Sequence, residues 1–296
     1  MGELHTRSVL VTGANRGIGL GLVRHFLGMP NPPEWVFAAC RDPKGQRAQE
    51  LQNLASKHPN LVIVPLEVTD PASIKAAAAR VGEQLGGSGL NLLINNAGIA
   101  KLNLLDTETL EDMTQVYTTN TVAPLLLGQA FLPLLKKAAE GSPGSALSCS
   151  KAAIVNMSSS AGSIEDVYLW HFGHVVSYRC SKAALNMLTK CQSLGYREHG
   201  VLCVALHPGW VQTDMGGSGS QKVRELLAKV WKNLFIWESR ACCGLDSLRL
   251  AGLWGSSLAD TLSRRHVREG DERWKNSSCP VLASPRSLQR APSPEQ

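Results

Sequence analysis

Short apolar runs alternate with longer amphipathic stretches through the first two thirds of this 296-residue chain. Six runs of four to six residues are each long enough for one strand, and the stretches between them repeat apolar residues at helical spacing. Strands that alternate with helices form a parallel sheet with helices on both faces. We therefore expect an α/β fold built on a doubly wound parallel sheet, with a ligand crevice at the carboxyl ends of its strands. The expected strands are 8–11, 35–40, 61–65, 90–95, 152–157 and 201–206, and the expected helices are 17–27, 46–57, 71–85, 110–139 and 176–199.

The amino-acid composition fits one large globular domain followed by a segment of a different kind. Hydrophobic residues make up 44% of the chain, which is ordinary for a packed protein. The formal net charge of +6 falls mainly after residue 217, where thirteen Lys and Arg stand against eight Asp and Glu. Because the rest of the chain is nearly neutral, the charge does not indicate a nucleic-acid-binding protein.

The chain changes character after Gly216 and Gly217. Residues 222–237 still repeat apolar residues at helical spacing, so we expect a helix that covers the ligand crevice or, alternatively, meets a membrane surface or a partner. Beyond Cys243 the chain is rich in Gly, Ser, Arg and Pro, and disorder is expected for most of it from about residue 270. We assign residues 1–217 to a single domain and residues 218–296 to an atypical C-terminal segment.

Cysteine spacing and hydropathy bear on the compartment. The eight cysteines show neither metal-site nor disulfide-framework spacing, which favours free thiols in a reducing compartment. The N-terminus leads directly into an expected strand, without the features of a signal peptide. No run of about 18 uncharged apolar residues occurs, so no spanning helix is expected. These patterns predict a soluble cytoplasmic protein without a metal site and without integral membrane association.

Tyr178 and Lys182 are four residues apart in an expected helix, so their side chains lie on one face. A phenol with its ordinary pKa of about 10 is a poor base at neutral pH. A neighbouring ammonium group favours the phenolate and lowers the phenol pKa. We expect a tyrosine that gives a proton to a carbonyl oxygen or takes one from an alcohol.

A glycine-rich turn follows the first expected strand, with Gly13, Gly17 and Gly19 at its bends. Such a turn lets the backbone approach a pyrophosphate and presents the N-terminus of the next helix to it. A glycine motif alone could be no more than a tight turn. Together with the Tyr178 and Lys182 pair, it predicts a dinucleotide cofactor.

The end of the second expected strand bears on the choice of cofactor. Enzymes that use NADH usually carry an acidic residue there, which binds the ribose 2′-hydroxyl. In this chain Arg41 takes that place and Arg16 lies in the glycine turn, and two guanidinium groups suit a 2′-phosphate. We expect NADPH rather than NADH. Asp42 favours the opposite choice, and Arg41 could instead be a solvated strand end.

These motifs resemble those of the short-chain dehydrogenase/reductase family, in particular its sniffer, C-factor and carbonyl reductase members. The resemblance covers residues 6–216. It implies a Rossmann fold and an NAD(P)-dependent oxidoreductase that interconverts a small-molecule carbonyl and an alcohol. The motifs that carry it are residues 12–19, residues 95–98, Asn120, residues 154–159, Tyr178 with Lys182, and residues 207–215.

The resemblance also implies roles for single residues. Ser159 would polarise the substrate carbonyl and Tyr178 would donate the proton. Lys182 would lower the tyrosine pKa and bind the nicotinamide ribose, while Asn120 would hold a water that links the lysine to solvent. Spacing does not choose between Ser158 and Ser159, but the family pattern selects Ser159. The implied cofactor-binding residues are Gly13, Asn15, Arg16, Gly17, Ile18, Gly19, Arg41, Glu67, Val68, Asn95, Ala97, Gly98, Tyr178, Lys182, Pro208, Gly209, Val211 and Thr213.

Two features depart from the family pattern. Nineteen positions separate Ser159 from Tyr178, which is more than is usual in the family. The aromatic residues of the added loop could form a wall of the substrate pocket. The two histidines of the loop could belong to that wall or could be surface residues. No final strand follows residue 215, as if the C-terminus had been substituted. The alternative to a carbonyl reductase is therefore a catalytically impaired dinucleotide-binding protein. Oligomeric state stays open, a homo-oligomer included. The loop aromatics are Tyr168, Trp170, His171, Phe172 and His174.

Overall fold

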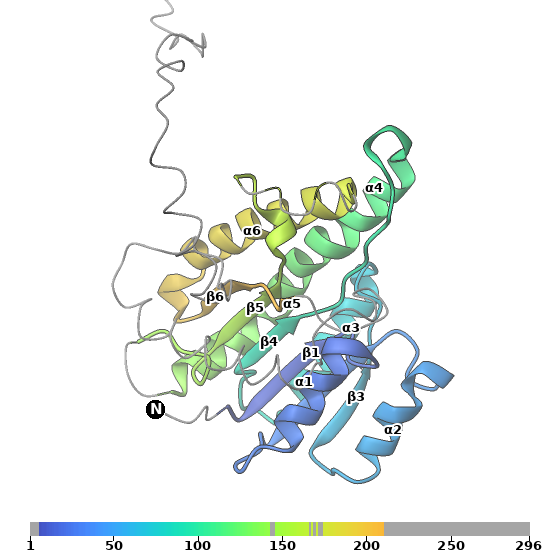
Figure 1. Cartoon of the computed structure of the whole chain (residues 1–296). Coiled ribbons are helices and arrows are strands. Elements are labelled where there is room, and N and C mark those ends of the chain that lie inside the picture. The colour runs from blue at the N-terminus through green and yellow to red at the C-terminus, as the bar shows by residue number, and fades with distance from the viewer. Residues whose placement is uncertain (1–5, 143–145, 166, 168–169, 171–173, 210–296) are drawn as a thin grey trace, which may run out of the picture. The chain divides into compact units, whose positions relative to one another are not determined.

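The computed structural model describes residues 6–142, 146–165, 167, 170 and 174–209. Six parallel strands form one sheet in the order β3-β2-β1-β4-β5-β6 (Figure 1). Each expected strand is present with its ends within two residues of the prediction, which confirms the doubly wound parallel sheet. The strands are β1 Ser8–Thr12, β2 Trp35–Cys40, β3 Leu61–Pro65, β4 Leu92–Asn95, β5 Ala153–Met157 and β6 Leu202–Leu206.

Helices connect successive strands, as parallel pairing requires. The strand order reverses between β1 and β4, and in doubly wound sheets the ligand lies outside the carboxyl ends of the strands at such a point. The α-helices are α1 Gly17–Leu27, α2 Gln49–Ala55, α3 Pro71–Gln84, α4 Leu110–Tyr117, α5 Ala123–Glu140 and α6 Val176–Gly195. Short 3₁₀ turns are η1 Gln46–Ala48, η2 Leu105–Thr107, η4 Ser160–Gly162 and η6 Arg197–His199.

Successive residues of β1 show how the two faces of the sheet are filled. Val9 and Val11 pack with α1 and α2 on one face, whereas Leu10 packs with α3 and α5 on the other. In Figure 1, α1 lies in front of the sheet. Phe26 of α1 and Phe131 of α5 are fully buried on opposite faces, and truncating either to Ala would cost about 3–5 kcal/mol.

The single helix expected over residues 110–139 is interrupted. Residues Thr118–Val122 form one π-helical turn, labelled η3, between α4 and α5. Pro124 has no N–H to donate to the Asn120 carbonyl four residues earlier, which accounts for a widened turn at this place. The turn buries Asn120, so the irregularity lies at a residue expected in the site.

Residues 110–140 together are long and apolar enough to cross a membrane by length and composition alone. In the fold, Leu127, Phe131 and Leu135 of this stretch are buried against the sheet. The apolar character of α5 is therefore explained by the protein core.

Candidate active site

The glycine turn between β1 and α1 has the backbone that its sequence predicts. Gly13 and Gly17 have φ angles of 62° and 53°, which residues with a Cβ rarely adopt. A Cβ on Gly19 would lie only 2.3 Å from the Gly13 carbonyl oxygen. The first turn of α1 carries neither a side-chain cap nor an acidic residue, so its N–H groups and helix dipole are suited to an anion.

Thr12 and Asn96 join the glycine turn to the end of β4. The Thr12 Oγ1 accepts from the backbone N–H groups of Asn96 and Ala97, both at 3.0 Å. The Asn96 Nδ2 donates to the Thr12 carbonyl oxygen at 2.9 Å. A Cβ on Gly13 would lie 3.0 Å from the Ala97 Cα, so the two segments pack backbone against backbone. These hydrogen bonds and backbone contacts bring two of the predicted cofactor-binding segments together.

Arg41, at the end of β2, pairs with Glu67, which follows β3. The Arg41 Nε lies 3.6 Å from the Glu67 Oε2, and the Arg41 side chain is 76% exposed. The other carboxylate oxygen of Glu67 accepts from the backbone N and the hydroxyl of Thr69. An exposed pair of this kind contributes at most about 1 kcal/mol, so Arg41 can exchange it for a ligand anion.

The Asp42 side chain is directed to the backbone of the turn that follows it. Its Oδ1 accepts from the Lys44 backbone N at 3.2 Å, and its Oδ2 lies where a Cβ on Gly45 would be. The carboxylate thus closes its own turn. Arg16 is exposed in the glycine turn, which neighbours the end of β2 because β1 and β2 pair in parallel.

The side chain of Asn95, which is expected to line the cofactor site, is buried at the end of β4. It is 3% exposed and donates from Nδ2 to the Asn156 Oδ1 at 2.8 Å. Asn156 in turn donates to Thr189 and Gln192 of α6. This buried chain of amides ties β4 to β5 and α6, so Asn95 would reach a cofactor only through its backbone. Val68 is likewise buried, while Asn15 and Ile18 are partly exposed in the glycine turn.

Tyr178 and Lys182 lie one turn apart on α6, as their spacing predicts. The Lys182 side chain is buried, and its Nζ donates to the Met157 carbonyl oxygen at 2.7 Å at the end of β5. The Nζ lies 5.5 Å from the centre of the Tyr178 ring. Burial lowers the pKa of Lys182 to about 8, so the amine still carries its proton at neutral pH.

The prediction that Lys182 lowers the pKa of Tyr178 is wrong for the protein without its cofactor. Burial raises the pKa of Tyr178, and a hydrogen bond with the Ser159 side chain opposes that shift only in part. Lys182 does not reverse it because its ammonium group is directed to Met157. A phenol with a raised pKa stays protonated at neutral pH, which is the form a proton donor needs.

The two adjacent serines have different surroundings. Ser158 is 3% exposed, and its hydroxyl donates to the Asn186 Oδ1 at 2.6 Å. Ser159 is partly exposed, caps η4 by accepting from the Ala161 backbone N at 3.1 Å, and meets Tyr178. Only Ser159 therefore combines access with contact to the phenol.

Asn120 is held by both ends of its side-chain amide. Its Oδ1 accepts from the Ile99 backbone N at 2.9 Å, and its Nδ2 donates to the Ile99 carbonyl and to the Ser181 Oγ. A Cβ on Gly98 would lie 3.2 Å from the Asn120 Oδ1 and 3.8 Å from the Lys182 Nζ. Gly98 therefore keeps open the space that Asn120 and Lys182 share.

The remaining predicted residues are described only in part. His207 has a buried Nδ1 without a hydrogen-bond partner among the described residues, and Gly209 has a φ of 78° beside Pro208. In the added loop, the His174 ring stacks on Trp170 with ring centres 4.3 Å apart. Val211, Thr213, Tyr168, His171, Phe172, residues 222–237 and the whole C-terminal segment lie outside the described residues.

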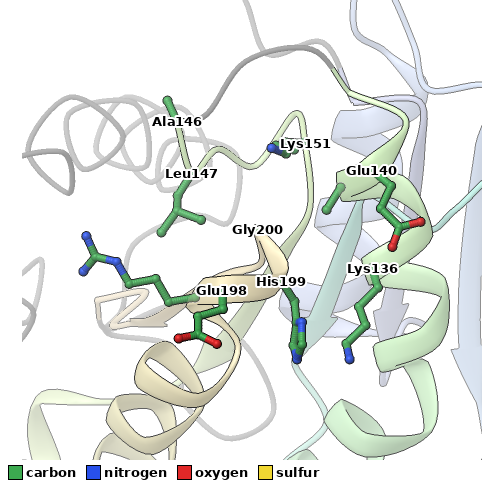
Figure 2. A pocket seen from close by; sticks show the side chains of 10 residues that line it. Lys136, Glu140, Ala146, Leu147, Lys151, Glu198, His199 and Gly200 are labelled. Carbon is green, nitrogen blue, oxygen red and sulfur yellow. The ribbon is translucent and has the colours of Figure 1, made fainter.

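A cavity of about 620 Å³ lies away from these residues, where β5 and β6 begin (Figure 2). Its wall mixes basic side chains such as Lys136 and Lys151 with the acidic Glu140 and Glu198. This end of the sheet is opposite to the strand ends that carry Met157 and the glycine turn. Among the described residues, no group of three or more His, Cys, Asp or Glu could hold a metal ion.

Several residues of the site escaped prediction from the sequence. Glu108 accepts from the Ser177 backbone N at 3.1 Å, although 69 positions separate the two residues. Asn156 and Asn186 anchor Asn95 and Ser158. Asn156 lies in the motif of residues 154–159, but no local pattern reveals the role of any of the three, because each acts through a partner distant in sequence.

Known proteins resemble this chain over most of its length. The sequence profile described as short chain dehydrogenase matches residues 7–224. Short chain dehydrogenase gsfK of Penicillium aethiopicum is 31% identical over 243 residues, which cover 81% of this chain and 90% of that protein. The crystal structure of NADPH-bound carbonyl reductase from chicken fatty liver has 75% identity and a TM-score of 0.77, with 79% of this chain and 88% of that chain covered. Carbonyl reductase Sniffer of D. melanogaster has 39% identity and a TM-score of 0.74, with 78% and 92% covered.

Proposed function

Because the chain belongs to the short-chain dehydrogenase/reductase family, we propose that it reduces a small-molecule carbonyl to an alcohol, with a hydride supplied by NADPH and a proton supplied by Tyr178. One observation carries the proposal. Tyr178 contacts Ser159 and lies one turn from the buried cation of Lys182. The Lys182 Nζ and the Asn120 Oδ1 in turn lie near the same space beside Gly98. In carbonyl reduction these four side chains would serve as the proton donor, the group that orients the carbonyl, the cation and the polar bridge to solvent.

The described residues fit NADPH. The left-handed glycines and the uncapped start of α1 form a cradle for the pyrophosphate. Arg16 and Arg41 are the two cations that would receive the 2′-phosphate, and Asp42, which would favour NADH, is turned into its own loop. Gly13, Asn15, Gly17, Ile18 and Gly19 would surround the phosphates. Glu67, Val68, Asn95, Ala97, Gly98, Pro208 and Gly209 would contribute mainly backbone, with Val211 and Thr213 completing the set.

The proton donor is prepared by its surroundings. Burial keeps the Tyr178 phenol neutral, so its proton is available to the carbonyl oxygen as negative charge develops there. Ser159 would donate to the same oxygen and orient it. Carbonyl reduction leaves the phenolate behind, and the Lys182 cation, 5.5 Å from the ring centre, stabilises that charge.

The phenolate must then regain a proton. Lys182 is the nearest candidate, because its pKa of about 8 allows it to give up a proton near neutral pH. Gly98 leaves room beside the Lys182 Nζ and the Asn120 Oδ1, where a water could carry a proton onward. Asn120 itself is fixed by Ile99 and Ser181, so it would orient that water rather than move.

The test is NADPH oxidation by the purified full-length protein across aldehydes, ketones and quinones, with NADH as the matched cofactor. We expect carbonyl-dependent oxidation that is faster with NADPH than with NADH. Tight NADPH binding without turnover of any carbonyl would refute the reductase and favour the alternative, a dinucleotide-binding protein without catalysis.

A further inference from the structure

We propose that Glu108 is a positioning residue for Tyr178, because its carboxylate fixes the first turn of the helix that carries the phenol. The inference rests on the proposed function, in which Tyr178 is the proton donor. Glu108 contacts the backbone of Ser177, the residue immediately before Tyr178. It therefore acts through the helix and not on the substrate.

Helix α6 begins without a cap of its own. Its N-cap residue is Val175, whose side chain makes no capping hydrogen bond and whose backbone is left-handed, with φ 39° and ψ 48°. This is the one residue other than glycine with a positive φ in the described part of the chain, and valine is poorly suited to it. In contrast, Asp70 caps α3 and Thr109 caps α4 through their side chains.

Glu108 supplies the missing cap from another part of the fold. Its Oε2 accepts from the Ser177 backbone N at 3.1 Å. First-turn N–H groups have no acceptor within their own helix, so this one depends on an external group. A carboxylate also has favourable electrostatics at a helix N-terminus. Ser177 is 1% exposed, so solvent cannot easily replace the carboxylate.

A polar network holds Glu108 in this position. The Asn103 Nδ2 donates to the Glu108 Oε1 at 3.2 Å and to the Asp112 Oδ2 at 2.7 Å, and the Lys101 Nζ lies 3.1 Å from the Asp112 Oδ1. Burial works to raise the pKa of Glu108, but the hydrogen bonds from Asn103 and Ser177 hold that pKa below its usual value. Glu108 is thus ionised at neutral pH.

A second contact attaches the same segment on the other side of Val175. The Leu105 backbone N donates to the His174 Nδ1 at 3.1 Å, and the His174 ring stacks on Trp170 with an interplanar angle of 4°. Leu105 and Glu108 therefore hold the chain at the residue before Val175 and at the second residue after it. The start of α6, and with it the placement of Tyr178, is set from outside the helix.

The experiment compares Glu108→Ala and Glu108→Gln with Glu111→Ala, in the full-length protein. Glu111 is an exposed carboxylate on α4 without a described ion pair, so it controls for the loss of a charge nearby. We expect Glu108→Ala to lower kcat for carbonyl reduction about 10- to 100-fold while the KM for NADPH changes less than about twofold. Glu108→Gln retains an acceptor oxygen and should recover part of kcat, and Glu111→Ala should behave as wild type. A fall in kcat no larger in Glu108→Ala than in the control would overturn the proposal.

Hydrogen exchange at the Ser177 amide provides a readout that does not need turnover. In Glu108→Ala this amide should exchange about tenfold faster or more, while the amides of 185–195 keep their protection. Unchanged exchange at Ser177 would refute the positioning role even in an active enzyme. If wild type reduces no carbonyl, the proposed function fails, and faster Ser177 exchange would still show that Glu108 fixes the helix start. Should Glu108→Ala not fold, Glu108→Gln serves for both measurements.

Discussion

The Lys182 ammonium lies 5.5 Å from the centre of the Tyr178 ring but directs a hydrogen bond of 2.7 Å to the backbone carbonyl of Met157. The cation is therefore fixed to the end of β5, independently of the phenol. Removal of the phenol oxygen should leave Lys182 in place, so the proton donor and the cation can be tested separately.

Tyr178→Phe removes only the hydroxyl that donates the proton. We expect kcat for carbonyl reduction to fall about 10³-fold, in the range that general acid catalysis contributes. The dissociation constant for NADPH, measured by fluorescence, should change less than about threefold, because Lys182 keeps its bond to Met157. Loss of NADPH binding in this variant would show that the phenol holds the cofactor and that its assignment as proton donor alone is wrong.

Ser158 and Ser159 form a matched pair for mutation to Ala. Ser159→Ala should lower kcat about 100-fold at unchanged thermal stability, because the partly exposed hydroxyl meets Tyr178. Ser158→Ala removes the donor to the Oδ1 of the partly buried Asn186 and should cost about 1 kcal/mol in the free energy of unfolding, with little effect on kcat. Melting curves and initial rates on both variants decide, and the reverse pattern would assign the orienting role to Ser158.

Local patterns in the sequence were enough to predict the sheet, the glycine turn and the Tyr178 and Lys182 pair, and the family they indicated is confirmed. Each of these depends on spacing within a few residues. The alternation of Val9, Leu10 and Val11 between two helix-covered faces follows directly from strand geometry. Contacts between residues that are distant in the sequence could not be predicted from such local patterns.

Three differences have a common physical origin. The raised pKa of Tyr178, the inward position of Asn95 and the bond from Ser177 to Glu108 all follow from burial or from partners about 60 to 70 positions away. Spacing on a helix shows that Lys182 is near Tyr178 but not that the ammonium is directed to Met157. The direction of a pKa shift depends on that detail, so the sequence could indicate the pair and not its electrostatics.

Arg41 and Glu67 provide a test of cofactor choice. Arg41→Asp should lower the ratio of kcat/KM for NADPH to that for NADH about 10- to 100-fold, because it removes a cation and adds a charge that repels the 2′-phosphate. Stability should change by less than about 1 kcal/mol, since the ion pair with Glu67 is exposed. Glu67→Gln, which frees Arg41 from its partner, should keep or raise the ratio. An unaltered ratio in Arg41→Asp would indicate that Arg16 and not Arg41 determines the preference for NADPH.

The buried amine of Lys182 predicts how stability depends on pH. Its pKa of about 8 in the folded protein is below the ordinary value of 10.5, so the folded state releases this proton first as pH rises. Between those values the unfolded chain binds more protons, and the free energy of unfolding should increase with pH. The raised pKa values of Cys203, about 12, and of Tyr178 act oppositely above pH 9, because there the unfolded chain loses those protons first.

The effect of Lys182 on the free energy of unfolding is therefore best measured between pH 8 and pH 9. Comparison with Lys182→Met separates this effect from those of the other titrating groups. From pH 8 to pH 9, urea unfolding should show wild type gaining about 1 kcal/mol relative to Lys182→Met. Below pH 7 the difference between the two proteins should be constant, because the amine is charged in both the folded and the unfolded wild type. A difference that stays constant up to pH 10 would mean that burial does not lower the pKa of Lys182, and the lowered pKa could then no longer support Lys182 as the proton source for Tyr178.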